Sequence, residues 1–239
     1  MAYQATFKRY ELKFMLDKHQ KARIMAAMQP YMSLDKYGRT TIRNIYFDTD
    51  NYQLIRHSIE KPAYKEKLRL RSYRPAGAAD PVFVELKKKY NSVVYKRRLS
   101  MPQSNALQWL AGEQAAAPQG QIAAEISYFK DLYHGIHPAV LLTYEREAWY
   151  SLDKSDFRVT FDDTILCRRE DICLEHEPWG TSLLPEGKVL MEIKTSGGIP
   201  LWMTHTLTDN HIFKTSFSKY GTAYEKMIFP NLKGGYLHV

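Results

Sequence analysis

The sequence predicts an α+β fold with helices packed outside an antiparallel sheet or closed barrel of eight strands. Alternation of apolar and polar residues, the pattern of a half-buried strand, recurs at 7–14, 41–48, 66–74, 82–88, 93–99, 140–149, 157–162 and 188–195. Helical patterns are scattered between these segments, and about eight strands with scattered helices favour an α+β fold. The 239 residues suit one unit of this kind, so we expect a single domain over 1–239.

The elements between the strands follow from local signals. The segment "DKHQKARIMAAM" begins at Asp17, a good capping residue, and places its apolar residues on one side of a helix. We expect further helices in "SNALQWLAGE" from Ser104, in "AAEISYFKDLYHGI" up to Gly135, and two helical pieces in "THTLTDNHIFKTSFSKYGTAYEKM". The turn-rich segment 74–81 predicts a hairpin loop, and the small residues of 113–121 predict a connector.

Positive charge is concentrated in one part of the chain. The sequence has 34 Lys and Arg against 26 Asp and Glu, a net charge of +8. Residues 61–98 alone hold 12 of these cations and 3 acids. The basic charge is therefore local. It indicates an anionic partner without saying whether that partner is nucleic acid, a membrane or a phosphate compound.

Cysteine content and hydropathy bear on the compartment. Cys167 and Cys173 predict reduced thiols in a cytosolic protein and argue against a cysteine-rich metal site. The start "MAYQATFKRYELKF" lacks the apolar core of a signal peptide. No run approaches the roughly 20 apolar residues of a membrane span. We expect a cytoplasmic chain without a transmembrane segment.

One stretch, "KEKLRLRSYR" at 65–74, sets three cations two residues apart with leucines between them. Side chains alternate between the faces of a strand, so the cations share one face and the leucines the other. The tripeptide Glu-aliphatic-Lys occurs at 11–13, 85–87 and 192–194, and in each the Glu and Lys share one strand face while the aliphatic residue points the other way. One face from each of seven strands then carries Lys13, Lys67, Arg69, Arg71, Lys87, Lys96, Arg98, Arg146, Arg158 and Lys194, with the carboxylates Glu11, Glu85, Asp162 and Glu192 among them.

The opposite faces of these strands are apolar and should be buried. They carry Leu68, Leu70, Val82, Val84, Leu86, Phe157, Val159, Phe161, Met191 and Ile193. For any one strand the ordinary interpretation is a solvated charged face. With helices covering the apolar faces of all seven, however, a closed sheet would turn the cations into its narrow interior.

Such an interior calls for a particular ligand. Like charges 4 Å apart repel by about 4 kcal/mol at an effective dielectric of 20, so we expect an anion of high charge density between them. Polyphosphate fits, because Arg forks and Lys ammonium groups both bind phosphate oxygens. Carboxylates in a phosphate site commonly hold Mg²⁺ or Mn²⁺, and Glu192 is the first candidate ligand, with Glu11 second. The alternative is that each glutamate simply pairs with neighbouring cations.

The sequence resembles the VTC-type polyphosphate polymerase domain of the triphosphate tunnel metalloenzymes, a CYTH-like superfamily. The resemblance rests on an ordered set of motifs across 7–224: "FKRYELKF", "IYFDTDNY", "KLRLRSY", "FVELKKK", "TYEREAW", "RVTFDDTI", "VLMEIKTSG" and "SFSKYGTAY". It implies an eight-stranded antiparallel tunnel that binds ATP and Mn²⁺ or Mg²⁺. There the γ-phosphate of ATP would pass to a growing inorganic polyphosphate chain.

Motif by motif, the resemblance and the charged strand faces together assign the site. We expect phosphoryl transfer to depend on Arg69, Arg71, Lys87, Arg146 and Arg158. Phosphate or nucleotide binding is assigned to Lys13, Lys67, Lys96, Arg98, Lys194, Ser218 and Lys219. Glu192 matches the family's metal-ligand position, and Glu11 is added from the charge pattern. The sequence has no P-loop or G-x-G-x-x-G motif, so side chains must hold the nucleotide.

Two positions depart from the family pattern. The hydrolytic branch begins with E-x-E-x-K, whereas this chain has Arg9 in place of the first Glu. A cation cannot serve there as ligand or base, which favours the polymerase branch. Where the polymerase has a Lys three residues before Lys219, this chain has Ser216, with Lys214 two positions earlier.

Two other functions remain open from the sequence. A hydrolase of tripolyphosphate or nucleoside triphosphates could use the same fold, with Glu11 and Glu192 holding a metal. A non-catalytic module for RNA or anionic lipid is the third reading, but the basic strands alternate with aliphatic residues rather than a stacking row of aromatics. We expect ATP and polyphosphate as partners, and no nucleic acid. Family members can also work beside membrane-embedded proteins.

Overall fold

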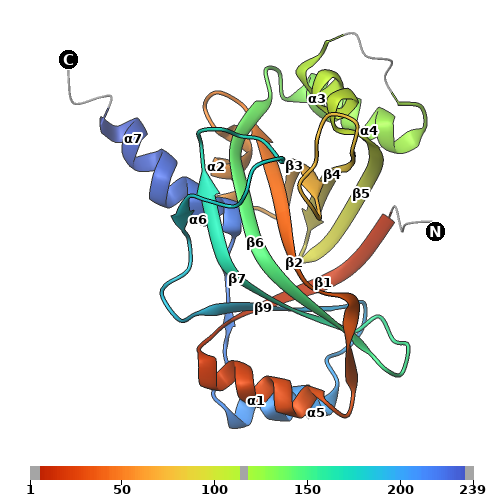
Figure 1. The fold of residues 1–239 in the computed structure, drawn as a ribbon, viewed down its shortest axis with the longest axis vertical. Coiled ribbons are helices and arrows are strands. Elements are labelled where there is room, and N and C mark those ends of the chain that lie inside the picture. Colours follow the sequence, from red (N-terminus) through yellow and green to blue (C-terminus); the bar gives the residue numbers. More distant parts are fainter. Residues whose placement is uncertain (1–5, 114–117, 235–239) are drawn as a thin grey trace.

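Eight strands pair into a closed antiparallel ring in the computed structural model, which describes residues 6–113 and 118–234 (Figure 1). Around the ring the order is β1–β5–β4–β3–β2–β6–β7–β9, and β9 pairs back onto β1. The strands are β1 (Thr6–Leu16), β2 (Met32–Asp48), β3 (Tyr64–Ser72), β4 (Pro81–Tyr90), β5 (Val93–Pro102), β6 (His137–Ser151), β7 (Arg158–Arg168) and β9 (Val189–Thr195). The predicted α+β fold with eight antiparallel strands is confirmed.

The ring is closed unevenly by β1. Its residues Thr6–Arg9 pair with β5, while Tyr10–Leu16 pair with β9 on the other side. A short strand that the sequence did not predict, β10 (Lys214–Thr215), extends the β5 side of β1. Another, β8 (Thr181–Ser182), adds to the edge of β7.

Helices surround the ring. They are α1 (Lys18–Met28), α2 (Gln53–Ile59), α3 (Gln103–Ala111), α4 (Gln121–Leu132), α5 (Leu201–Asp209), α6 (Lys219–Ala223), the π-helical turn η1 (Tyr224–Ile228) and α7 (Phe229–Gly234). Asp17 caps α1 as predicted, in a reciprocal capping box with Gln20. The helix expected to reach Gly135 ends at Leu132, and α2 was not predicted.

Three apolar clusters fasten these helices to the ring. One packs α3 and α4 against β3 and β4, and another packs α1 and α5 against β1, β7 and β9. Figure 1 shows these two helix pairs at opposite ends of the molecule. The third cluster joins α6 and η1 to residues of β2, β6 and β7. All ten residues predicted on the apolar strand faces are buried.

Asp48, the last residue of β2, ties α2 and α6 together. Its carboxylate accepts hydrogen bonds from the backbone N–H groups of Thr49, Leu54 and Ile55, at 2.9–3.0 Å. It also accepts a hydrogen bond from the Tyr220 hydroxyl of α6 at 2.8 Å. Burial raises the pKa of Asp48 above its ordinary value. This buried junction fixes α6 relative to the ring.

Within 6–113 and 118–234, the helices are all too short or too polar to cross a membrane.

Candidate functional site

A cavity of about 1250 Å³ lies within the ring of strands. Fourteen lysines and arginines line it, against three glutamates. Twelve of the fourteen predicted site residues are among the lining residues: Glu11, Lys13, Lys67, Arg69, Arg71, Lys87, Lys96, Arg146, Glu192, Lys194, Ser218 and Lys219. The cationic strand faces therefore do point inward, and α6 contributes to the wall.

Glu85 of β4 is the centre of a first cluster of cations. It has no exposed surface, and its carboxylate lies 2.7 Å from the Arg69 guanidinium and 3.2 Å from Lys96 Nζ. Arg71 and Arg98 approach it at 3.7 and 4.0 Å. Burial opposes ionisation, but the charges of Arg71, Arg69 and Lys96 outweigh it and hold the pKa of Glu85 well below its ordinary value. This carboxylate neutralises and orients the cations around it, but Glu85 does not line the cavity and is therefore not a candidate metal ligand there.

Neutral side chains complete the positioning of the two arginines. Arg71 donates to Asn44 Oδ1 at 2.8 Å and to the Tyr144 hydroxyl at 3.0 Å. Arg69 donates to the Tyr46 hydroxyl at 3.0 Å. The sequence analysis did not assign these three partners to the site. Tyr46 and Asn44 could have been found, because they alternate along β2 opposite the arginines of β3.

Asp162 and Glu192 form a second centre, between β7 and β9. Lys219 Nζ lies 2.6 Å from Asp162 and 3.2 Å from Glu192. Arg146 reaches the same two carboxylates at 2.6 and 3.5 Å. Burial opposes the charge of Lys219, but Asp162 and Glu192 outweigh it and raise its pKa.

Glu192 also pairs with cations from its own strand and from β1. Lys194 lies 3.0 Å from it and Lys13 lies 3.7 Å from it. Burial, together with the charge of Arg146, lowers the pKa of Lys194 to about 7. Lys13 donates to the backbone carbonyl of Phe217 at 2.6 Å, which links β1 to the segment before α6.

Ser218 joins α6, which contributes to the cavity wall, to strand β3. It caps α6 by accepting from the backbone N–H of Gly221 at 3.1 Å, and the same hydroxyl accepts from Lys67 Nζ at 3.2 Å. The helix start that presents Lys219 is therefore joined directly to β3. Ser216 and Lys214, the departures from the family pattern, also line the cavity.

Glu11 and Glu192 are the candidate ligands of a divalent metal. Both carboxylates face the cavity and are ionised at neutral pH. Burial opposes ionisation, but Lys87 lowers the pKa of Glu11 to about 2, and Lys219 and Lys194 hold that of Glu192 well below its ordinary value. Mg²⁺ is commonly bound by one or two carboxylates, with water and substrate phosphates completing its shell. The pair fits that donor set, although Lys87 lies 2.6 Å from Glu11 and would have to share it.

Two predicted residues do not line the cavity. Arg98 stacks over the Phe83 ring at 4.7 Å and lies 4.0 Å from Glu85. Arg158 stacks over the Tyr150 ring at 4.2 Å. The alternation placed both on the correct strands, but neither reaches the wall of the cavity.

Four further lysines extend the cationic wall beyond the predicted set: Lys61, Lys65, Lys89 and Lys214. Burial lowers the pKa of Lys65 and of Lys89, and neighbouring lysines lower both further. We call these four the rim lysines. Lys65 and Lys89 could have been found, since each continues the two-residue spacing of β3 or β4 by one step.

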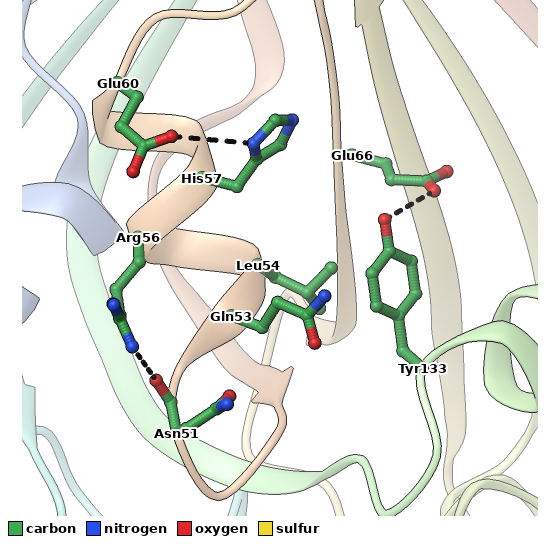
Figure 2. A pocket seen from close by; sticks show the side chains of 8 residues that line it. All are labelled: Asn51, Gln53, Leu54, Arg56, His57, Glu60, Glu66 and Tyr133. Atoms are coloured by element: carbon green, nitrogen blue, oxygen red, sulfur yellow. Dashed lines mark hydrogen bonds and ion pairs between the residues drawn. The ribbon is translucent and has the colours of Figure 1, made fainter.

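A second cavity of about 500 Å³ lies beside α2 (Figure 2). Its wall includes Glu66, whose carboxylate accepts from the hydroxyls of Tyr133 at 3.3 Å and Tyr64 at 2.8 Å. Figure 2 shows Tyr133 and Glu66 facing the helix across this space. None of the predicted site residues lines it.

Comparison with known proteins matches the chain to one family along most of its length. The family model described as the VTC domain matches residues 8–228. No curated protein matches the sequence significantly.

Solved structures share its fold at low sequence identity. A Bacillus halodurans protein proposed to be an adenylate cyclase has a TM-score of 0.56 and 16% identity, covering 94% of this chain and 100% of its own. A second proposed adenylate cyclase, from Vibrio parahaemolyticus, has a TM-score of 0.45 and 11% identity, covering 92% and 98%. A Pyrococcus horikoshii protein has a TM-score of 0.43 and 13% identity, covering 94% and 98%.

Proposed function

This chain belongs to the VTC domain family, and from that premise we propose that it is a polyphosphate polymerase that uses ATP. The observation that carries the proposal is the closed ring of strands with fourteen lysines and arginines lining its cavity. A linear polyanion with about one charge per phosphate suits such a wall better than a compact ligand does. The replacement of a hydrolase-type Glu by Arg9 favours chain growth over hydrolysis.

The proposed reaction moves one phosphoryl group. The bond between the β- and γ-phosphates of ATP breaks, and ADP leaves with the bonding electrons. A terminal oxygen of the polyphosphate chain forms the new bond to the γ-phosphorus. The terminal phosphate has a last pKa near 6 by analogy with phosphoesters, so at neutral pH the acceptor is already largely ionised and needs no strong base.

The role of the protein is alignment and charge stabilisation, which dominate phosphoryl transfer. Arg69 and Arg71 are the groups proposed to stabilise the transferring phosphoryl, because Glu85, Tyr46 and Tyr144 already hold both guanidinium groups in place. Donors fixed before the reaction cost no reorganisation when charge develops. By analogy with arginine fingers, such an Arg supplies about 10³–10⁵ in rate.

The remaining predicted residues take roles according to their place. Lys219 and Arg146, held by Asp162, would bind phosphates beside Glu192 together with Lys13, and Lys87 would do so beside Glu11. A Mn²⁺ or Mg²⁺ ion at Glu192 and Glu11 would neutralise phosphate charge and orient the γ-phosphate. Arg98 and Arg158, away from the cavity wall, are proposed to support their neighbours rather than to touch substrate.

Hydrolysis is the second candidate, favoured by the two carboxylates Glu11 and Glu192 in one cavity. A hydrolase gains from a carboxylate that orients water, and it would release orthophosphate without chain growth.

One assay separates the candidates. Protein with ATP and Mn²⁺ should form ADP and long phosphate chains, with one phosphate added to a chain for each ADP released. Glu192→Gln should abolish both products, while the exposed Glu60→Gln should keep both. Orthophosphate as the only phosphate product would replace the polymerase with the hydrolase. Binding of polyphosphate by wild type and Glu192→Gln alike, with no turnover of ATP, would instead indicate a binding module.

A further inference from the structure

Three different metal-binding side chains converge outside the cavity. They lie in the loop 169–180 between β7 and β8: Asp171, Cys173 and His176. One potential ligand atom of each lies within 4.8 Å of the other two. Among residues 6–113 and 118–234 this is the one set of three or more His, Cys, Asp or Glu side chains with that closeness.

The core of the protein brings these residues together. Leu174 is fully buried in the cluster beneath α3 and α4, and Ile172 packs against the same cluster. Asp171, at φ +46°, begins a tight turn in which the backbone N–H of Cys173 donates to the Asp171 carbonyl at 2.9 Å, and this turn brings the two side chains together. His176 reaches the same point, with its Nδ1 2.6 Å from Asp171 Oδ2.

The buried side chain of Arg168 holds Asp171 in place. Arg168, only 2% exposed, donates to the Asp171 backbone carbonyl at 3.0 Å and lies 3.3 Å from Asp171 Oδ2. The Trp179 ring covers its guanidinium at 4.7 Å. Gly180 then closes the loop at φ +135°, where a Cβ would come within 2.3 Å of the Cys167 carbonyl oxygen. Hydrogen bonding that orients a ligand from behind is typical of protein metal sites.

We propose that Asp171, Cys173 and His176 bind one Zn²⁺ ion, with water in the fourth position. Thiolate, imidazole and carboxylate are the three ligand types zinc takes in proteins, and thiolate disfavours Mg²⁺ and Mn²⁺. Zinc–ligand bonds of about 2.0–2.3 Å put neighbouring ligand atoms roughly 3.5 Å apart in a tetrahedron. The ligand atoms, at most 4.8 Å apart, need to move by roughly 1 Å, with Asp171 and His176 giving up their 2.6 Å contact, and rotation of these partly exposed side chains allows this.

The site is separate from the proposed phosphate site. None of its three residues lines the cavity. The loop reaches the hairpin after β3 instead, where the backbone N–H of Ala76 donates to the Leu174 carbonyl at 3.2 Å. All three ligands belong to the β7–β8 loop, so zinc would stiffen this loop, which the Ala76–Leu174 hydrogen bond places beside the hairpin that follows Arg69 and Arg71.

Cobalt(II) provides a direct test, because a cobalt–thiolate bond gives a charge-transfer absorption. The full chain, stripped with a chelator and freed of it, is titrated with Co²⁺ and then with Zn²⁺. We expect one equivalent of Co²⁺ to give this absorption and one equivalent of Zn²⁺ to remove it. Cys173→Ser should lose the absorption, and His176→Ala should bind far more weakly. The buried Cys167→Ala and the cavity variant Glu192→Gln should both behave as wild type.

The outcomes are decisive in either direction. Absorption that persists in Cys173→Ser, or a lack of absorption in wild type at a tenfold excess of Co²⁺, would overturn the proposal. Zn²⁺ should also raise the melting temperature of wild type and Cys167→Ala but not of Cys173→Ser. Far-ultraviolet circular dichroism checks that each variant is folded, and proton release on zinc binding accompanies metal binding by the thiol.

Discussion

Glu85 shows how a cavity crowded with like charges is made stable. The carboxylate is fully buried, and Arg69, Lys96, Arg71 and Arg98 all lie within 4.0 Å of it. Each cation that gains a carboxylate partner also loses part of its repulsion from the others. The interior therefore does not depend on a bound anion alone: the charge pattern of the sequence led us to expect such an anion, but at Glu85 the alternative holds, in which the glutamate pairs with neighbouring cations.

Replacing Glu85 by Gln should strongly destabilise the fold. Removing one partner of a buried ion pair leaves uncompensated charge and costs about 3–5 kcal/mol. The measurement is the free energy of unfolding from urea denaturation. Arg74→Gln is the control, because Arg74 pairs with Asp80 at the surface and should change stability by less than about 1 kcal/mol. Equal effects of the two substitutions would show that Glu85 is not the centre of this cluster.

Lys96 should take up a proton when a polyanion binds. Burial, partly offset by Glu85 and reinforced by Arg71, lowers the pKa of Lys96 to about 6, so in the free protein at pH 8 it is neutral and the three arginines are the charged partners of Glu85. A phosphate beside it would raise that pKa and drive uptake of up to one proton per bound chain. Calorimetry of metal-free tripolyphosphate binding at pH 8, in two buffers of different ionisation enthalpy, measures this uptake.

The Lys96 prediction has an internal control. Lys96→Arg keeps its charge at every accessible pH and should therefore reduce the uptake by the share that Lys96 supplies. The same shift has a sign for stability: the folded state binds Lys96 protons more weakly than the unfolded chain, so this residue contributes less stability as pH falls from the ordinary lysine range toward 6. Proton uptake that is unchanged in Lys96→Arg would assign it to other groups.

For single residues, the sequence predicted which face of a strand a side chain occupies, but not whether that side chain reaches the cavity. Two-residue spacing on a strand shows which side chains share a face, and ten predicted strand residues line the cavity for that reason. Ser218 and Lys219, at the start of α6, were assigned from the family motif instead. Arg98 and Arg158 share those faces but stack on Phe83 and Tyr150, because position along the ring depends on the register between strands. Register is a tertiary property that one strand does not encode alone.

The helix caps Asp17 and Ser218 differ in that only Ser218 also contacts a side chain of the cavity. Asp17 caps α1, which packs on the outside of the ring. Ser218 caps α6 and also accepts from Lys67 inside the cavity. Asp17→Ala and Ser218→Ala should each lower stability by about 1 kcal/mol. Only Ser218→Ala should also weaken tripolyphosphate binding, measured by calorimetry; equal binding by both variants would separate Ser218 from the site.

Elements were predictable where local patterning agrees with packing. Each of the eight strands of the ring overlaps a predicted segment, although β2 begins at Met32 instead of 41 and β7 ends at Arg168 instead of 162, and the β3–β4 connection is the expected hairpin. α2 escaped prediction because it has seven residues, and Asp48 holds its start through contacts that also involve α6. β8 and β10 have two residues each, too few for any alternation to appear.

For the whole molecule, the rim lysines should make binding depend on chain length. They lie in the same cavity as the paired cations but outside the clusters of Glu85 and Glu192. Lys89→Glu with Lys214→Glu should weaken binding of long polyphosphate by about tenfold, since each exposed ion pair contributes up to about 1 kcal/mol. Tripolyphosphate, which is too short to occupy the deep site and the rim together, should lose much less. Competition binding at two salt concentrations measures both ligands.

The control for the rim is a pair of exposed lysines away from the cavity, Lys36→Glu with Lys154→Glu. It changes the net charge by the same amount, so it isolates position from overall attraction. If both double variants weakened long-chain binding equally, the rim would have no specific role.

Closure of the ring by β9 also constrains synthesis. Tyr10–Leu16 are synthesised well before their partner Val189–Thr195, which follows them only after the other six strands of the ring. Until then the nascent chain carries two unpaired strand edges, on β1 and on β7, and open edges are templates for aggregation. Chains released before Thr195 therefore lack the seam of the ring and become candidates for chaperone capture or degradation.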